Sequence, residues 1–335
     1  EHLTHPEHRY RNTAPRFSAI AFCYRYQYKV ETCAAVACLA DYRRNEGLGN
    51  ARRMAEQDLS LSKEAERAAP STRAKPLNEC TALITGSTAG LGQAMAARLA
   101  EAGCGVILHG LEDAEQIEAQ RDDLARKTGA RVAYHKADLS TLSGVEGLIN
   151  AAMSVLGPID ILVNNAVVRH FAPVIEFPTE QWDLALAVNL SAAFHAIRLL
   201  LPNMRSRNFG RIFNITSVYG MRGTTDRVGY VTTKSAILGL TRAVALENLD
   251  RDVTCHSLCP GSVLTPGTEE RVERLMAERR IDRTAAERLF LEGKQPGGNF
   301  VSAGSISDLL VFLCGPIARD MTGSVLPVEA GWLAS

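Results

Sequence analysis

Short apolar runs alternate with helical patterns from Cys80 to the end of the chain. The runs that have the length of buried strands are 81–85, 106–109, 131–136, 159–163, 210–215, 253–259 and 324–328. Between them, apolar residues recur three and four positions apart, as they do on one face of a helix. Strands that alternate with helices are typical of a parallel sheet covered by helices on both faces. The pattern predicts one α/β domain of the doubly wound Rossmann type over residues 76–335.

The helical patterns are less uniform than the strands. The segments expected to be helical are 93–102, a polar stretch ending at Thr128, about 180–205, 230–249 and 304–314. Residues 262–300 are charged and loop-like, with only short helical patterns. A segment of this kind near the end of such a domain is expected to form a lid over a ligand site.

Residues 1–75 lack this alternation, and we interpret them as an N-terminal extension that is disordered or not part of the catalytic fold. The apolar run 32–40 is too short to span a bilayer and lies too far from the first residue for a good signal peptide. Arginine outnumbers acidic residues before residue 54, as in organelle transit peptides, but serine is scarce there. Met54 would make a sensible start, and we expect residues 1–53 to be dispensable.

Composition narrows the classes of partner. The chain has 335 residues, of which 46% are hydrophobic and 22% charged, and its formal net charge is zero. A neutral chain of this kind gives no reason to expect a nucleic-acid or membrane partner. The eight cysteines form no CxxC pair or zinc-finger spacing, so we expect reduced cysteines, no metal and a cytoplasmic location, with organelle import as the weaker alternative.

A glycine-rich turn follows the first strand. Gly86, Gly90 and Gly92 stand between the run 81–85 and the first helical pattern. Glycine allows a tight turn and a close approach of the backbone to a pyrophosphate at the helix N-terminus. In this context the turn indicates a dinucleotide site.

Tyr230 and Lys234 stand four residues apart at the start of a helical pattern, so both side chains lie on one face. Acid–base work by tyrosine at neutral pH requires its pKa to fall by roughly three units, about 4 kcal/mol. One cation about 4 Å away supplies roughly that much at an intermediate dielectric. The alternative is an ordinary pair on a solvated helix face.

From about Leu77 to Ser335 the chain resembles the short-chain dehydrogenase/reductase family. The residues that carry the resemblance, in order, are Thr85-Gly86-xxx-Gly90-x-Gly92, Asn164-Asn165-Ala166, Asn189, Ser217, Tyr230-xxx-Lys234 and Pro260-Gly261. The resemblance implies a sheet order of 3-2-1-4-5-6-7 with about seven strands. It also implies four catalytic residues: Tyr230 as acid/base, Ser217 on the substrate oxygen, Lys234 on the nicotinamide ribose, and Asn189 in a proton relay. The implied cofactor contacts are Gly86, Ser87, Gly90, Leu91, Gly92, His109, Asp138, Leu139, Asn165, Ala166, Lys234, Pro260, Gly261 and Val263.

Within the family, phrases such as His170-Phe-Ala-Pro173 and Glu292-Gly-Lys-Gln-Pro296 are most similar to the 3-hydroxybutyrate dehydrogenase branch. The branch's carboxylate site is rewritten here, with Arg169, Tyr219 and Arg227 in place of Gln, His and Lys, while Gln295 is retained. The predicted substrate residues are Arg169, Ser217, Tyr219, Arg227 and Gln295. Two arginines can grip a carboxylate bidentately, although solvated loop arginines are the alternative. Ser262 in place of tryptophan enlarges the expected pocket, so a longer or different hydroxy acid is as well supported as 3-hydroxybutyrate.

The cofactor expected from these residues is NAD rather than NADP. No arginine or lysine stands at Ser87, Thr88 or 109–111 to pair with a 2′-phosphate, and Glu112 and Asp113 would repel one. The leading hypothesis is therefore an NAD-dependent dehydrogenase of a small hydroxy acid. The alternatives are a reductase of another carbonyl (acyl thioester, cyclic ketone or sugar) and a non-catalytic nucleotide-binding sensor. The family resemblance and the wide apolar pattern on 180–205 and 230–249 also predict a homotetramer.

Overall fold

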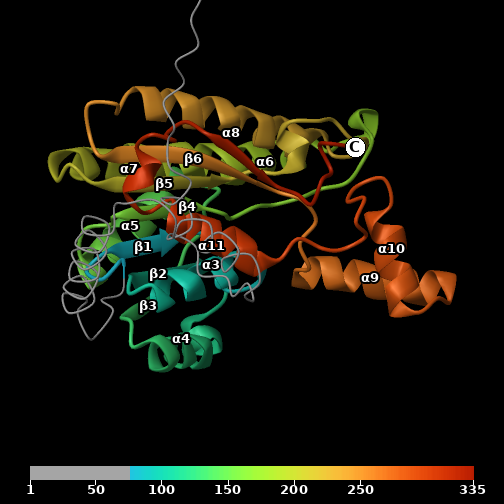
Figure 1. Cartoon of the computed structure of the whole chain (residues 1–335), viewed down its shortest axis with the longest axis horizontal. Helices are drawn as coiled ribbons and strands as arrows, with labels where there is room; N and C mark the ends of the chain where they lie inside the picture. Colours follow the sequence, from blue (N-terminus) through green and yellow to red (C-terminus); the bar gives the residue numbers. More distant parts are fainter. Residues whose placement is uncertain (1–75) are drawn as a thin grey trace, which may run out of the picture. The chain divides into compact units, whose positions relative to one another are not determined.

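A computed structural model describes residues 76–335, which form a parallel sheet covered by helices on both faces (Figure 1). The predicted extension, residues 1–75, lies outside the described residues. The strands are β1 (Thr81–Ile84), β2 (Gly105–Gly110), β3 (Val132–Lys136), β4 (Ile161–Asn164), β5 (Gly210–Ile215), β6 (Val253–Pro260) and β7 (Val325–Val328). Their order in the sheet is β3-β2-β1-β4-β5-β6-β7, which confirms the predicted fold.

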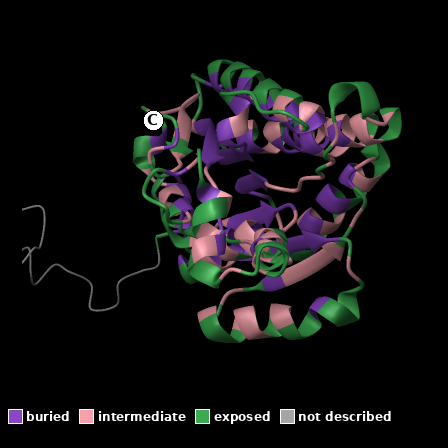
Figure 2. Ribbon diagram, turned by 90° about the vertical axis from the view of Figure 1, so that its right-hand side faces the viewer, coloured by how far each residue is buried: buried purple, intermediate pink, exposed green. Residues whose placement is uncertain are grey.

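Each strand pair is parallel, and side chains alternate between the two faces. In β1, Ala82 and Ile84 join the apolar cluster on one face, whereas Leu83 joins the cluster on the other. Because both faces are covered, the strands read as continuous apolar runs. Figure 2 shows the central strands buried, whereas the edge strands β3 and β7 are mostly of intermediate burial.

The helices divide between the two faces. Their bounds are α3 (Gly90–Glu101), α4 (Ala114–Thr128), α5 (Leu142–Leu156), α6 (Thr179–Leu186), α7 (Ala192–Ser206), α8 (Val228–Leu246), α9 (Pro266–Arg279), α10 (Arg283–Leu291) and α11 (Ala303–Phe312). Side chains of α3 and α11 belong to one apolar cluster, and side chains of α5, α7 and α8 belong to the other.

The predicted helix at about 180–205 is not a uniform α-helix. A π-helical turn, η3 (Ala187–Ser191), joins α6 to α7 and contains Asn189. The whole run Thr179–Ser206 is long and apolar enough, by length and composition, to cross a membrane. Core helices share that property, and Ala196 and Leu200 of this run are buried in the cluster beside the sheet.

The predicted lid region contains two regular helices, α9 and α10, rather than mostly loop. Asp282 caps α10 by accepting a hydrogen bond from the Ala285 amide at 2.8 Å. In Figure 1 both helices stand beside one end of the sheet, apart from the layers that cover its faces. Their position makes this segment a wall of the site described next.

Candidate active site

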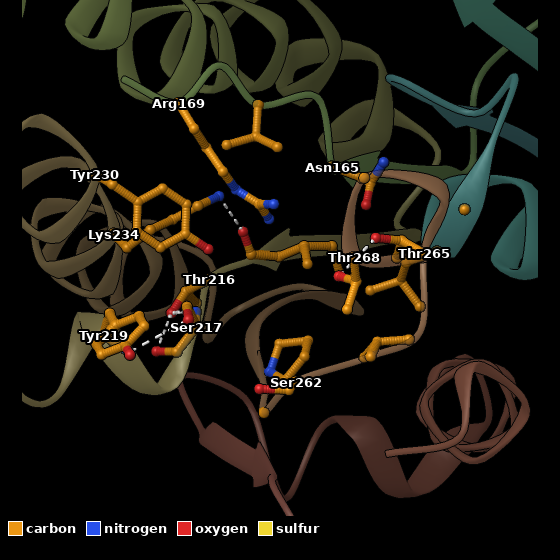
Figure 3. Close-up of a pocket in the computed structure, with 18 of the residues that line it drawn as sticks. Asn165, Arg169, Thr216, Ser217, Tyr219, Tyr230, Lys234, Ser262, Thr265 and Thr268 are labelled. Atoms are coloured by element: carbon orange, nitrogen blue, oxygen red, sulfur yellow. Dashed lines mark hydrogen bonds between the residues drawn. The ribbon is translucent and has the colours of Figure 1, made fainter. Parts of the chain in front are cut away.

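A cavity of about 480 Å³ lies at the carboxyl ends of the strands (Figure 3). Gly86 follows β1, Asn165 follows β4 and Ser217 follows β5, and all three line it. Ligands of open parallel sheets bind at this edge. The cavity extends from the glycine turn, past Tyr230, to the helices of the lid region.

The glycine turn brings backbone groups unusually close together. Gly86 and Gly90 have φ angles of +62° and +58°, which glycine adopts without strain. A Cβ on Gly92 would lie 2.1 Å from the Gly86 carbonyl oxygen. Helix α3 begins here without a side-chain cap, so its first amides are available to an anion.

Two side chains, those of Asn165 and His109, hold the turn by hydrogen bonds to its backbone. The Asn165 amide donates to the carbonyls of Thr85 and Gly86 at 2.9 and 2.8 Å. The Nδ1 atom of His109 accepts from the Gly86 amide at 3.0 Å, so Nε2 donates to the Ala137 carbonyl at 3.1 Å. Burial lowers the pKa of His109, in keeping with this neutral form. His109 and Ser87, predicted as cofactor contacts, therefore lie behind the cavity rather than in its wall.

Tyr230 and Lys234 are buried one turn apart on α8. The Lys234 Nζ atom lies 5.8 Å from the centre of the Tyr230 ring and donates to the Ile215 carbonyl at 2.6 Å. Burial alone would raise the pKa of Tyr230, but the charges of Arg169 and Lys234 and a hydrogen bond with Ser217 outweigh it, and the pKa is lowered. Burial lowers the pKa of Lys234, and attraction to Tyr230 opposes that shift.

Arg169 is a second cation beside the tyrosine. Its guanidinium carbon lies 5.2 Å from the centre of the Tyr230 ring, and Figure 3 shows the side chain reaching into the cavity beside that ring. The sequence analysis assigned Arg169 to the substrate carboxylate. In the structure Arg169 lines the cavity, where it can bind a carboxylate, and it also lies close enough to Tyr230 to lower the pKa of that tyrosine.

Asn189 sits behind this pair, in the π-helical turn. Its Oδ1 accepts from the Val168 amide at 2.8 Å, and its Nδ2 donates to the Val168 carbonyl at 3.0 Å. A π-helical turn carries one more residue than an α-helical turn, and such turns are frequent at functional sites. Asn189 is thus fixed beside the Tyr230 helix, but outside the wall of the main cavity.

The structure brings most of the predicted residues together. Those that line the cavity are Gly86, Gly90, Leu91, Gly92, Asn165, Ala166, Arg169, Ser217, Tyr219, Arg227, Tyr230, Lys234, Pro260, Gly261 and Val263. Those that do not are Ser87, His109, Asp138, Leu139, Asn189 and Gln295.

Gln295 and Asp138 are occupied by local hydrogen bonds. Gln295 is buried, and its amide accepts from the Ser262 amide at 2.6 Å and donates to the Asn299 carbonyl at 2.6 Å. These bonds hold the loop after β6. Gln295 was predicted as a substrate residue, but its side chain does not line the cavity. The Asp138 carboxylate accepts from the Ser140 amide and hydroxyl, both at 2.9 Å, and these bonds lower its pKa.

The lining residues that were missed as site residues include four with charged or aromatic side chains: Arg271, Phe290, Lys294 and Trp332. Three of them lie in the segment 262–300, where charged residues read as a solvated surface. No spacing in that segment distinguishes Arg271 from the exposed arginines around it.

The residues at the glycine end fit a nicotinamide dinucleotide. The close approach of Gly92 to the Gly86 carbonyl keeps the turn free of side chains, as a pyrophosphate site requires, and a carboxylate lies beside the turn. This is Glu112, whose Oε1 accepts from the Thr88 hydroxyl at 2.9 Å. Its Oε2 is buried and has no hydrogen-bond partner within residues 76–335.

Comparisons with known proteins agree with this geometry. A family model for short chain dehydrogenases matches residues 80–275. A D-beta-hydroxybutyrate dehydrogenase of Cupriavidus necator is 40% identical over 258 residues, which cover 77% of this chain and 99% of that protein. A D-beta-hydroxybutyrate dehydrogenase of Rhizobium meliloti is 38% identical over 255 residues, covering 76% and 98%.

Among solved structures, the L-sorbose reductase of Gluconobacter frateurii in complex with NADPH and L-sorbose superposes with a TM-score of 0.74. It is 27% identical, and the match covers 78% of this chain and all of that one (100%). The chain therefore belongs to the short-chain dehydrogenase family, and it is an oxidoreductase that acts on a CH–OH group with a nicotinamide cofactor.

Proposed function

We propose that the chain is an NAD-dependent dehydrogenase of a small hydroxy acid similar to 3-hydroxybutyrate. The observation that carries the proposal is the pair of arginines, Arg169 and Arg227, in the same cavity as Tyr230 and Ser217. Guanidinium groups bind carboxylates, so a hydroxy acid would be held with its hydroxyl at the tyrosine. The two hydroxybutyrate dehydrogenases among the relatives support the same class of substrate.

Each residue at the reacting end of the cavity has its own role in the proposed reaction. Tyr230, with its lowered pKa, takes the proton of the substrate hydroxyl, and the Ser217 hydroxyl hydrogen-bonds to the same oxygen. The positive charges of Lys234 and Arg169 stabilise the phenolate form of Tyr230, which must be present before the tyrosine can take the proton. A nicotinamide ring, when bound, accepts the hydride from the substrate carbon. In reduction, Tyr230 returns the proton to the new hydroxyl.

Glu112 supports NAD as the dinucleotide. A Cβ on Gly110 would lie 2.1 Å from the Glu112 Oε2 atom, so the carboxylate covers the end of β2. The negative charge of this carboxylate, beside the glycine turn, would repel a 2′-phosphate. Asp113, the other acid named in the sequence analysis, pairs with Lys136 at 2.7 Å and is exposed.

Charge distinguishes a hydroxy acid from the sugar, cyclic ketone and acyl thioester alternatives. A neutral sugar or ketone gives no carboxylate for Arg169 and Arg227 to bind, whereas a hydroxy acid pairs with both. The sensor alternative requires a site that binds dinucleotide without turnover. Such a site has no need for a buried tyrosine with a lowered pKa.

The test is a dehydrogenase screen of hydroxy acids, sugars and alcohols with each dinucleotide. We expect hydroxy acids to give the highest kcat/KM and NAD to exceed NADP by tenfold or more. A higher kcat/KM for neutral alcohols or sugars would overturn the substrate class. A tenfold preference for NADP, about 1.4 kcal/mol, would overturn the choice of cofactor. Dinucleotide binding with no turnover of any compound would favour the sensor.

A further inference from the structure

The substrate end of the cavity carries more positive charge than one carboxylate can neutralise. Arg169, Arg227, Arg271 and Lys294 all line it, in addition to Lys234 at the tyrosine. No aspartate or glutamate is among the lining residues within the described part of the chain. In that same part, no ion pair joins any of these four cations to a carboxylate.

Aromatic rings, rather than carboxylates, hold three of these cations in place. The guanidinium carbons of Arg227 and Arg271 lie 4.7 and 5.3 Å from the centre of the Phe171 ring. Arg271 also lies 5.3 Å from the centre of Phe290, and the Lys294 Nζ atom lies 3.9 Å from the same centre. Cations and rings therefore alternate from Arg227 to Lys294. Ring faces position a cation without cancelling its charge.

Burial and mutual repulsion both lower the pKa values of Lys294 and Arg271. Burial lowers the pKa of Lys294 to about 8, and the charges of Arg271 and Arg227 add to the effect. Burial also lowers the pKa of Arg271, with further lowering by Arg227 and Arg169. Charges brought together in this way are relieved by an anion bound among them.

An unused donor lies at the same end. The indole Nε1 of Trp332 is buried and has no hydrogen-bond partner within residues 76–335. Trp332 lines the cavity, and its ring centre lies 5.2 Å from that of Tyr219. Buried donors without a partner are uncommon in proteins.

We propose that the preferred substrate is a hydroxy acid with a second anionic group, a carboxylate or a phosphate, which binds among Arg227, Arg271 and Lys294. This inference rests on the proposed function and names the substrate class for the same site. The first carboxylate lies toward Arg169, next to the hydroxyl at Tyr230. The second lies toward the lid helices α9 and α10.

Three substrates of similar length test the inference in the full chain with NAD. They are 3-hydroxypentanoate, 3-hydroxyglutarate and the 4-phosphate of 3,4-dihydroxybutyrate. We expect 3-hydroxyglutarate or the phosphate to exceed 3-hydroxypentanoate in kcat/KM by at least about tenfold, and the better of the two identifies the second group. Equal or lower kcat/KM for both dianions would overturn the inference while leaving the proposed function intact.

A variant pair locates the second anion. Arg271→Gln should reduce the preference for the dianion by about tenfold. Arg279→Gln removes the same charge from the last turn of α9, outside the cavity wall, and should leave the ratio unchanged. If Arg271→Gln lowers kcat/KM equally for dianion and monoanion, Arg271 is structural and the assignment is wrong.

A binding measurement keeps the two proposals separate. Calorimetry of the enzyme with NADH should give a lower Kd for glutarate than for pentanoate, again by at least about tenfold. This result would stand even if no hydroxy acid were turned over, in which case only the proposed function would fail. Equal affinity for the two ligands would overturn the second anion site.

Discussion

The two ends of the cavity bind by different means. At the glycine end, Gly86, Gly90 and Gly92 bring the backbone to the ligand, and Glu112 adds a negative charge nearby. Among residues 76–335, no basic side chain lines that end of the wall. At the substrate end, cations held on ring faces dominate, and no carboxylate offsets them within the described residues.

The two ends illustrate binding by close fit and binding by electrostatic attraction. The dinucleotide end works by close contact, so one added methyl group is enough to disturb it. The substrate end works by Coulomb attraction, which weakens gradually with distance and with salt. Substitutions of the glycines at the first end should therefore act through fit, and substitutions of the cations at the second should act through charge, pH and ionic strength.

Tyr230, where the two ends meet, should give the largest effect. Tyr230→Phe removes the hydroxyl that exchanges the proton, so kcat should fall on the order of 10²–10⁴-fold. Dinucleotide affinity should be nearly unchanged, because the hydroxyl faces the substrate oxygen. Steady-state kinetics and fluorescence titration with NADH measure the two quantities. Near-normal kcat would remove Tyr230 from the mechanism.

At the glycine end, Gly92→Ala should weaken dinucleotide binding by roughly tenfold to a hundredfold, from overpacking of about 1–3 kcal/mol. The new Cβ cannot remain 2.1 Å from the Gly86 carbonyl, so the turn must shift. Gly147→Ala is the control, because a Cβ there meets nothing within 4 Å on the exposed face of α5. Unaltered NADH affinity in Gly92→Ala would show that shape does not govern this end.

Arg169→Gln tests charge without removing the tyrosine. Because the Arg169 charge lowers the pKa of Tyr230, its loss should raise that pKa. Alcohol oxidation needs the phenolate, so the rise of kcat with pH should move to higher pH, with about tenfold less activity at neutral pH and recovery in alkali. Arg169→Lys should restore part of the neutral activity. A pH profile unchanged in Arg169→Gln would exclude Arg169 as an activator.

Glu112→Gln should narrow the preference for NAD over NADP on the order of fivefold, because one repulsive charge is removed at an incompletely screened distance. The ratio of kcat/KM values for the two dinucleotides measures it. Asp113→Asn removes an equal charge that is paired with Lys136, and it should change the ratio little. Equal shifts in both variants would point to a general field rather than to Glu112.

The smallest effect on chemistry should come from the outer face of α8, away from both ends of the cavity. We propose a homotetramer in which this face, with exposed Ala236, Gly239 and Ala243, meets a second copy. A Cβ on Gly239 meets nothing within 4 Å, so Gly239→Glu should fold yet block close helix contact. Light scattering should show smaller assemblies for Gly239→Glu and not for Gly147→Glu. A monomeric parent protein would contradict the assembly.

Sequence patterns predicted the fold class and the residues at the strand ends, because both depend on the order of neighbouring residues along the chain. The apolar run at 210–215 coincides with β5, and Ser217 follows it into the cavity. Strand order came from the family resemblance, since a run of apolar residues does not identify its neighbour. The helix α5 was not assigned, although it packs against β2 and β3.

The directions of the side chains could not be predicted from the sequence. His109 and Gln295 occupy expected positions, yet their side chains hydrogen-bond to backbone behind the wall. Conversely, Arg271 enters the wall only because α9 packs with one face toward the cavity. A motif gives the position of a residue in the chain, whereas the packing of its element determines where the side chain points.

The π-helical turn around Asn189 also makes the site depend on a count of residues. Each residue advances an α-helix by about 100°, so deleting one residue within Ala187–Ser191 would convert the turn to regular α-helix. Either the segment before the deletion or the one after it would then rotate by that angle. Asn189 would lose its bonds to Val168 if the rotation fell on its side, although hydrophobic composition would scarcely change. A single-codon deletion could thus leave a helix that looks better formed and a site that no longer assembles.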